Sequence, residues 1–133
     1  MTQRDVVVDA SVVASWLLPS DTGDKTVEIL GRVRLHAPSI FWAETRNILL
    51  AAERRKRLTE TMMVEAVSLL PAVRVRLDTA PEGDYVMGLA RVYELTAYDA
   101  LYLELALRRQ APLLTLDRNL AAAAAGEGLP TLR

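Results

Sequence analysis

Two aspartates follow apolar runs that have the pattern of buried strands. Asp9 comes directly after the β-branched run Val6–Val8, and Asp117 comes directly after Leu113–Leu116. In parallel α/β sheets, ligands bind beyond the carboxyl ends of the strands. If both runs are parallel strands, the two aspartates lie on the same rim. The sequence therefore directs the search for a reactive site to that rim.

Two further acidic residues are predicted to reach the same rim from helices. Glu44 lies in the first turns of a helix predicted to begin at Phe41, shortly after the predicted strand Leu35–Ala37. Asn47 follows three residues later and shares the same helical face. Asp99 opens another apolar helix. We therefore expect four carboxylates to converge at one rim.

Convergent carboxylates favour a divalent cation. Like charges in a cleft raise one another's pKa values unless a cation neutralises them. Mg²⁺ and Mn²⁺ prefer carboxylate and water oxygens, so neither histidine nor cysteine is required as a ligand. A metal held in this way activates water and stabilises charge on a phosphoryl oxygen. The predicted cofactor is Mg²⁺ or Mn²⁺, and the chemistry that fits it is phosphodiester hydrolysis.

The elements that must position these acids alternate between β-like and helical periodicity. Pro19 and Pro71 are read as helix stops, and Thr59 as a helix cap. The predicted strands are Val6–Val8, Leu35–Ala37, the alternating edge run Val73–Leu77, Leu113–Leu116 and Thr131–Leu132. The predicted helices are Ala10–Leu18, Asp24–Val33, Phe41–Arg57, Glu60–Leu70, Glu82–Tyr93, Ala97–Arg109 and Leu120–Ala125.

This alternation predicts a three-layer α/β/α sandwich with a mainly parallel central sheet and right-handed crossovers. The chain has no internal repeat, linker or low-complexity tail. Its 133 residues suit one core, so residues 1–133 are predicted to form a single domain.

Composition narrows the class of protein. Hydrophobic residues make up 51% of the chain and charged residues 25%, close to the averages for soluble domains. The chain has no cysteine, which excludes disulfides and thiolate metal sites. Neither a signal peptide nor a membrane span is found, so a cytoplasmic location is expected. A net charge of -1 argues against broad phosphate neutralisation, so any nucleic acid must be held locally.

Each aspartate of the predicted cluster also has a simpler explanation. Aspartate is a favoured N-cap, and Asp9, Asp99 and Asp117 each precede or open a predicted helix. A set of four acids is less easily explained by capping. The remaining glutamates and three other aspartates are interpreted as solvated charges: Asp24, Asp78 and Asp84.

Four segments carry a resemblance to a known family. VVVDASVVASWLLP, FWAETRNILL, TAYDALYLELA and LLTLDRNL resemble the successive signature segments of VapC-type PIN-domain toxins. Each segment is short, but their order and spacing are specific, and they span nearly the whole chain. The resemblance implies a PIN-like fold.

The resemblance also implies a site, an activity and partners. The four acids match the family's metal positions and none is replaced: Asp9, Glu44, Asp99 and Asp117. Polar support is implied from Ser11, Asn47, Thr115 and Asn119. The family implies a homodimeric endoribonuclease toxin that cleaves RNA. A cognate VapB-like antitoxin is expected to fill the toxin's groove with its C-terminal segment.

Other nucleotide-binding classes lack their motifs. The chain contains no GxxxxGK[ST], and Gly126 and Gly128 lack the context of a dinucleotide fingerprint. Its two lysines, Lys25 and Lys56, lie in helical regions rather than where a phosphoacceptor receiver domain needs one. The alternative that stays open is a PIN-like binding module that keeps the fold and partner but cleaves nothing. The four intact acids count against it.

The remaining notable residues have structural interpretations. His36, the only histidine, lies in a predicted strand and is assigned no catalytic role. The run Arg54–Arg57 is interpreted as a solvated helix end in preference to an RNA contact. Three aromatic residues could stack on bases or bind an antitoxin helix, but their apolar neighbours favour packing in the core or at an interface. These residues are Trp16, Phe41 and Trp42. Tyr98 adjoins Asp99, and substrate contact and packing on the sheet are equally open for it.

Overall fold

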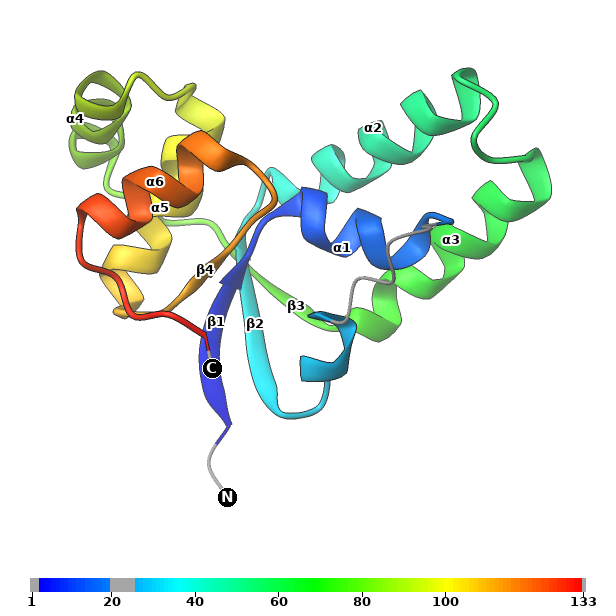
Figure 1. Cartoon of the computed structure of the whole chain (residues 1–133), viewed down its shortest axis with the longest axis horizontal. Coiled ribbons are helices and arrows are strands. Elements are labelled where there is room, and N and C mark those ends of the chain that lie inside the picture. Colours follow the sequence, from blue (N-terminus) through cyan, green and yellow to red (C-terminus); the bar gives the residue numbers. More distant parts are fainter. Residues whose placement is uncertain (1–2, 20–25, 133) are drawn as a thin grey trace.

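The computed structural model describes residues 3–19 and 26–132. A parallel sheet lies at its centre and helices flank it on both sides (Figure 1). The strands are β1 (Arg4–Val8), β2 (Val33–Pro38), β3 (Val75–Asp78) and β4 (Leu113–Leu114). The helices are α1 (Ala10–Leu17), the 3-10 helix η1 (Thr26–Ile29), α2 (Phe41–Arg54), α3 (Glu60–Val73), α4 (Gly83–Tyr93), α5 (Ala97–Arg109) and α6 (Arg118–Gly126).

The sheet has the order β3-β2-β1-β4, and every strand pair is parallel. Figure 1 shows α1, α2 and α3 on one side of the sheet and α4, α5 and α6 on the other. The predicted three-layer α/β/α sandwich is therefore confirmed. The register aligns Val8 with Leu114, so the carboxyl ends of β1 and β4 lie together.

Burial on both faces explains the composition of the central strand. Val6, Val7 and Val8 of β1 are each 0% exposed, as expected for a parallel strand covered by helices on both sides. Six residues of helix α5 are buried, and among them Tyr102 and Leu103 are completely buried. Residues of α5 therefore hold fixed positions relative to the sheet.

Several predicted element boundaries are wrong. The predicted strand Leu113–Leu116 is limited to β4, and Thr131–Leu132 is not a strand. Helix α3 runs through Pro71 to Val73, so neither the predicted stop nor strand residue Val73 is correct. Pro71 has no N–H to donate to the preceding turn, but the helix continues for two more residues before Arg74 ends it in the left-handed conformation.

The predicted helix Asp24–Val33 is also not observed in the part of the chain that the structure describes. Residues 26–29 form only η1, and Val33 already begins β2. Asp24 and Lys25 lie outside the described residues. Strand pairing explains the difference at Val33, which aligns with Arg4 of β1.

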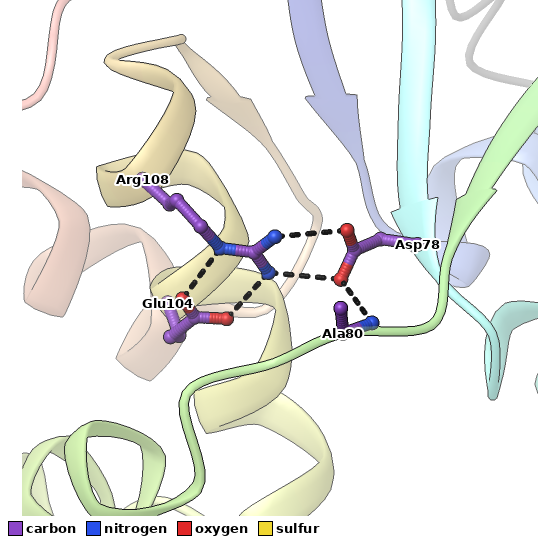
Figure 2. Close-up of polar contacts among 4 residues, drawn as sticks. All are labelled: Asp78, Ala80, Glu104 and Arg108. Carbon is purple, nitrogen blue, oxygen red and sulfur yellow. Dashed lines mark hydrogen bonds and ion pairs between the residues drawn. The ribbon is translucent and has the colours of Figure 1, made fainter.

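Two acids predicted to be solvated are instead part of an ion-pair network. The side chain of Glu104 is 3% exposed, and Arg108 binds both Glu104 and Asp78 (Figure 2). The prediction failed because helical periodicity places Glu104 on α5 but gives no information about which element packs against it. Within the described residues, none of the helices combines the length and apolarity needed to traverse a lipid bilayer.

Candidate active site

Asp9 lies at the rim where β1 and β4 end. Its backbone N–H donates to the carbonyl of Leu114 at 2.9 Å, which joins the end of β1 to the end of β4. The residue is 7% exposed. A buried carboxylate requires hydrogen-bond partners, and the surrounding side chains provide them.

Two hydroxyl groups hold the Asp9 carboxylate. Ser11 Oγ donates to Asp9 Oδ2 at 3.0 Å, and Thr115 Oγ1 donates to the same oxygen at 2.7 Å. Thr115 Oγ1 in turn accepts the N–H of Asp117 at 3.0 Å. The segment between β4 and α6 is therefore tied to Asp9, and this network brings Asp117 toward Asp9.

Glu44 reaches the site from the first turn of α2. Its Oε1 accepts a hydrogen bond of 2.6 Å from the hydroxyl of Tyr102, a completely buried residue of α5. The sequence analysis did not identify Tyr102. Two features of the sequence could have identified Tyr102. It lies three residues after Asp99 on the same helical face, and a buried tyrosine hydroxyl usually requires a hydrogen-bond partner.

The pKa shifts show that the acids lie within one another's electrostatic field. Burial raises the pKa of Glu44, the charges of Asp9 and Asp99 raise it further, and the hydrogen bond from Tyr102 lowers it. Burial likewise raises the pKa of Asp99, as do the charges of Asp117 and Asp9. Four acids that are far apart in sequence therefore interact across this rim.

The geometry also tests the capping explanation for each aspartate. Asp9 occupies the N-cap position of α1, but its side chain makes no capping hydrogen bond. Helix α5 is capped by Thr96, whose Oγ1 accepts the N–H of Asp99 at 3.1 Å. Only Asp117 caps its helix, because its Oδ1 accepts the N–H of Leu120 at 2.9 Å. Capping therefore leaves Asp9 and Asp99 unexplained.

The donor set fits a hard divalent cation in its chemistry. All four side chains offer carboxylate oxygens, the ligands that Mg²⁺ and Mn²⁺ prefer. However, no three acidic or histidine side chains of the described residues lie close enough together to hold one ion. Glu44 is turned onto Tyr102, and Asp117 is turned onto the start of α6.

A hollow of about 510 Å³ adjoins Glu44. It is lined by Ile40, Ala43, Glu44, Asn47, Leu50 and Tyr98. Asn47 lines this hollow together with Glu44, in agreement with the predicted shared face. Tyr98 is 57% exposed rather than packed on the sheet. Asn119 is exposed in the first turn of α6, and within the described part of the chain no hydrogen bond links its side chain to the four acids.

His36 lies outside this group of acids. It is 2% exposed in β2, and its Nε2 lies 2.9 Å from Asp5 Oδ1. Burial lowers the pKa of His36, so the ring favours its neutral form. These contacts agree with a structural role.

Comparison with known proteins identifies the family. The family model described as the PIN domain matches residues 6–126. The chain is 31% identical over 121 residues to Ribonuclease VapC3 of Pyrobaculum aerophilum, covering 87% of this chain and 92% of that protein. It is 34% identical over 126 residues to Ribonuclease VapC3 of Mycobacterium tuberculosis, covering 90% of this chain and 88% of that protein.

Solved structures show the same fold. PAE2754 from Pyrobaculum aerophilum has a TM-score of 0.70 at 25% identity, covering 94% of this chain and 90% of that one. VapC20 of Mycobacterium tuberculosis, a toxin that cleaves the sarcin-ricin loop, has a TM-score of 0.61 at 16% identity, covering 96% and 98%. The second likeness supports the fold alone. The resemblance inferred from the signature segments is thus confirmed, and the chain belongs to the PIN-domain family as a protein of the VapC toxin type.

Proposed function

We propose that this protein is a metal-dependent endoribonuclease and the toxin of a type II toxin–antitoxin module. RNA phosphodiester bonds are hydrolysed at Asp9, Glu44, Asp99 and Asp117. The observation that carries the proposal is the hydrogen-bond network through Thr115 that joins Asp117 to Asp9. The raised pKa values of Glu44 and Asp99, which arise from burial and from the charges of neighbouring acids, also support it. The VapC relatives, which are named ribonucleases, support the reaction class.

The four carboxylates are the proposed ligands for Mg²⁺ or Mn²⁺. When bound, such an ion supplies positive charge that stabilises the charge developing on the phosphate. Ser11 and Thr115 orient Asp9 by donating to one of its oxygens. Tyr102 holds Glu44 in a similar way. The hydroxyl groups thereby leave other carboxylate oxygens available for the ion.

The proposed partners follow from the VapC type. They are an RNA substrate, a cognate VapB-like antitoxin and a second copy of this chain in a homodimer. The antitoxin, the dimer and the cytoplasmic location stay predictions. Copurification with the product of the neighbouring gene tests the antitoxin, and light scattering of the purified chain tests the dimer.

One observation favours the alternative, a PIN-like module that binds an antitoxin-type partner or RNA without cutting it. Among the described residues, no three acids are close enough to share an ion. The two functions are distinguished by RNA cleavage. The enzyme cleaves RNA when a divalent metal is present, whereas the binding module does not cleave RNA at all.

The first prediction is that the purified protein cleaves RNA with Mg²⁺ or Mn²⁺ and that EDTA stops cleavage. Asp9→Asn should lower the cleavage rate by on the order of 100-fold or more, because it removes one negative charge from the proposed metal site. The amide oxygen can still accept the hydrogen bonds of Ser11 and Thr115, so the local structure should be kept. Gel analysis of a broad RNA panel measures the products.

Asp84→Asn is the matched control. It also converts an aspartate to an amide, but at an exposed position in the first turn of α4. We expect full activity from this variant. Cleavage that persists in EDTA contradicts the metal mechanism. Metal binding without cleavage of any RNA in the panel supports the binding module instead.

A further inference from the structure

The carboxylates of the candidate active site repel every RNA phosphate that does not contact the metal ion. Affinity for the rest of the strand must therefore come from another surface. The net charge of the whole chain is -1. A protein of this charge binds polyanions only where its basic residues are grouped apart from its acids. The described surface contains one such group of basic residues, near the start of α2.

A groove of about 230 Å³ is lined by residues from the start of α2, the end of α3 and the edge strand β3, and it lies on the side of α2 that faces away from Glu44. Figure 1 shows where these three elements lie. We call it the Trp42 groove and define it by Trp42, Arg46, Pro71, Arg74 and Leu77. Trp42 is 57% exposed and Leu77 is 43% exposed. The groove is therefore an open surface with an apolar floor.

An aromatic ring and a guanidinium group are held together in this groove. The Cζ atom of Arg46 lies 3.9 Å from the centroid of the Trp42 ring. Arg46 Nη1 also donates to the carbonyl of Trp42 at 2.8 Å. These two contacts fix a pair of planar groups, on which unpaired nucleic-acid bases stack.

The groove is also basic. Arg46 and Arg74 line it, and Arg74 and Arg76 line an adjoining hollow of about 530 Å³. Neither lining contains an aspartate or glutamate among the described residues. Among the residues that the structure describes, Arg34 and Arg108 form ion pairs with acids. Arg46, Arg74 and Arg76 form none within the same set of residues. Their charges remain available to a polyanion.

The Trp42 groove adjoins the candidate active site through one helix end. Trp42 and Glu44 are two residues apart in the first turn of α2, so they project from different sides of that turn. The hollow on the Glu44 side presents another exposed aromatic side chain, that of Tyr98. A single strand that crosses this helix end can therefore contact both sides.

We propose that the Trp42 groove binds the single-stranded RNA segment that flanks the cleaved bond. An unpaired base stacks on the Trp42–Arg46 pair, while Arg74 and Arg76 neutralise the phosphates that follow. The inference rests on the proposed function and adds to it that the substrate is unpaired over this segment. An exposed aromatic ring beside arginines suits stacked bases better than it suits an acidic peptide.

The test measures RNA binding separately from cleavage. A fluorescent single-stranded RNA of mixed sequence and its duplex are titrated in EDTA, with anisotropy as the readout, against the wild-type chain. The charge variant is Arg46→Gln, Arg74→Gln and Arg76→Gln. Its control is Arg54→Gln, Arg55→Gln and Arg57→Gln, which removes the same charge from exposed residues at the end of α2.

We expect the charge variant to bind the single strand at least ten-fold more weakly than wild type. The slope of log Kd against log salt should fall by about 1.4, since Arg74 and Arg76 each contact one phosphate and each single-strand contact contributes roughly 0.7. The control variant should keep most of the wild-type slope. Trp42→Leu should weaken single-strand binding on the order of ten-fold and abolish the preference over the duplex.

Equal binding by the charge variant and its control overturns the inference, and the groove then becomes a surface for a protein partner. Failure of the proposed function is a separate result, because it appears as the absence of metal-dependent cleavage by the wild-type chain. Circular dichroism of each variant checks the fold. Trp42, Arg74 and Arg76 are exposed and Arg46 is only half-buried, so their replacement should be tolerated.

Discussion

At the scale of single residues, two tyrosine–glutamate hydrogen bonds have different surroundings. The hydroxyl of Tyr102 donates to Glu44 from a completely buried position beside the four acids. The hydroxyl of Tyr93 donates to Glu127 at the surface, between α4 and the end of α6. The first bond orients a proposed metal ligand, whereas the second only joins two helices.

We predict that Tyr102→Phe weakens Mn²⁺ binding about ten-fold, because partners that orient a ligand typically contribute this much to metal affinity. Calorimetric titration without RNA measures the affinity, and kcat and KM for RNA are measured alongside. The ring still fills its place in the core, so the free energy of unfolding should fall by only about 1 kcal/mol.

Tyr93→Phe is the matched control for Tyr102→Phe. It removes the same type of hydroxyl from a bond with a glutamate that is not part of the acidic group. We expect its Mn²⁺ affinity to equal that of the wild type. If both variants bind Mn²⁺ equally well, Tyr102 does not position Glu44 for the metal.

At the scale of elements, one arginine connects α5 with the end of β3. Figure 2 shows Arg108 between Glu104 and Asp78. Its guanidinium donates to both carboxylates at 2.8 to 2.9 Å, and Asp78 Oδ2 also accepts the N–H of Ala80 at 3.3 Å. Since α5 carries Asp99 and Tyr102, this bridge helps to fix the helix that supports the site.

We predict that Asp78→Asn lowers the free energy of unfolding by about 1 kcal/mol at neutral pH. The value lies below the usual range for charge-assisted bonds, because the Arg108 side chain is 35% exposed and solvent screens the pair. Arg108→Gln should cost more, about 3 kcal/mol, because it leaves the buried carboxylate of Glu104 without its partner. Urea titration measures both variants.

The effect of Asp78→Asn should also depend on pH. The Arg108 guanidinium holds the pKa of Asp78 below its ordinary value of 3.8. Ionised Asp78 therefore contributes its stability above that ordinary value, and the contribution is lost as the pH falls through the lowered pKa. The difference between wild type and variant should be constant near neutrality and shrink in acid. A difference that grows in acid contradicts the assignment.

At the scale of the whole molecule, the structure separates charges that nearly cancel in the sequence. Asp9 and Asp117 follow β1 and β4, and Glu44 and Asp99 approach them from α2 and α5, whereas Arg74 and Arg76 lie at the start of β3, at the opposite edge of the sheet. A net charge of -1 therefore conceals an acidic site and a basic surface. Under the proposed function, the acidic site binds the metal and the basic surface binds the strand.

We predict that the whole chain unfolds in one cooperative transition, because the four strands share a single sheet and a common core. Mn²⁺ at about a hundred-fold excess over its Kd should stabilise the fold by about 2.7 kcal/mol. Asp9→Asn should lose most of this gain, and Asp84→Asn should keep it. Scanning calorimetry measures all three, and two separate transitions in the wild type contradict a single domain.

The sequence by itself determined the features that depend on neighbouring residues. Strand β1, helix α5 and the cap at Thr59 were predicted correctly because periodicity and capping act over a few positions. Asp9 and Asp117 were also accessible from the sequence, since each follows an apolar run. The choice of Glu44 and Asp99 as partners of these acids was strengthened by the family's signature segments.

Only the tertiary structure decided what depends on packing between distant segments. Tyr102 meets Glu44 across 58 positions, and Thr115 meets Asp9 across 106. Pro71 continues α3 where the local rule predicts a stop, and its side chain then lines the Trp42 groove. Side-chain type and spacing specify which groups need partners. Which groups meet is set by how whole helices and strands pack, and that depends on the entire core at once.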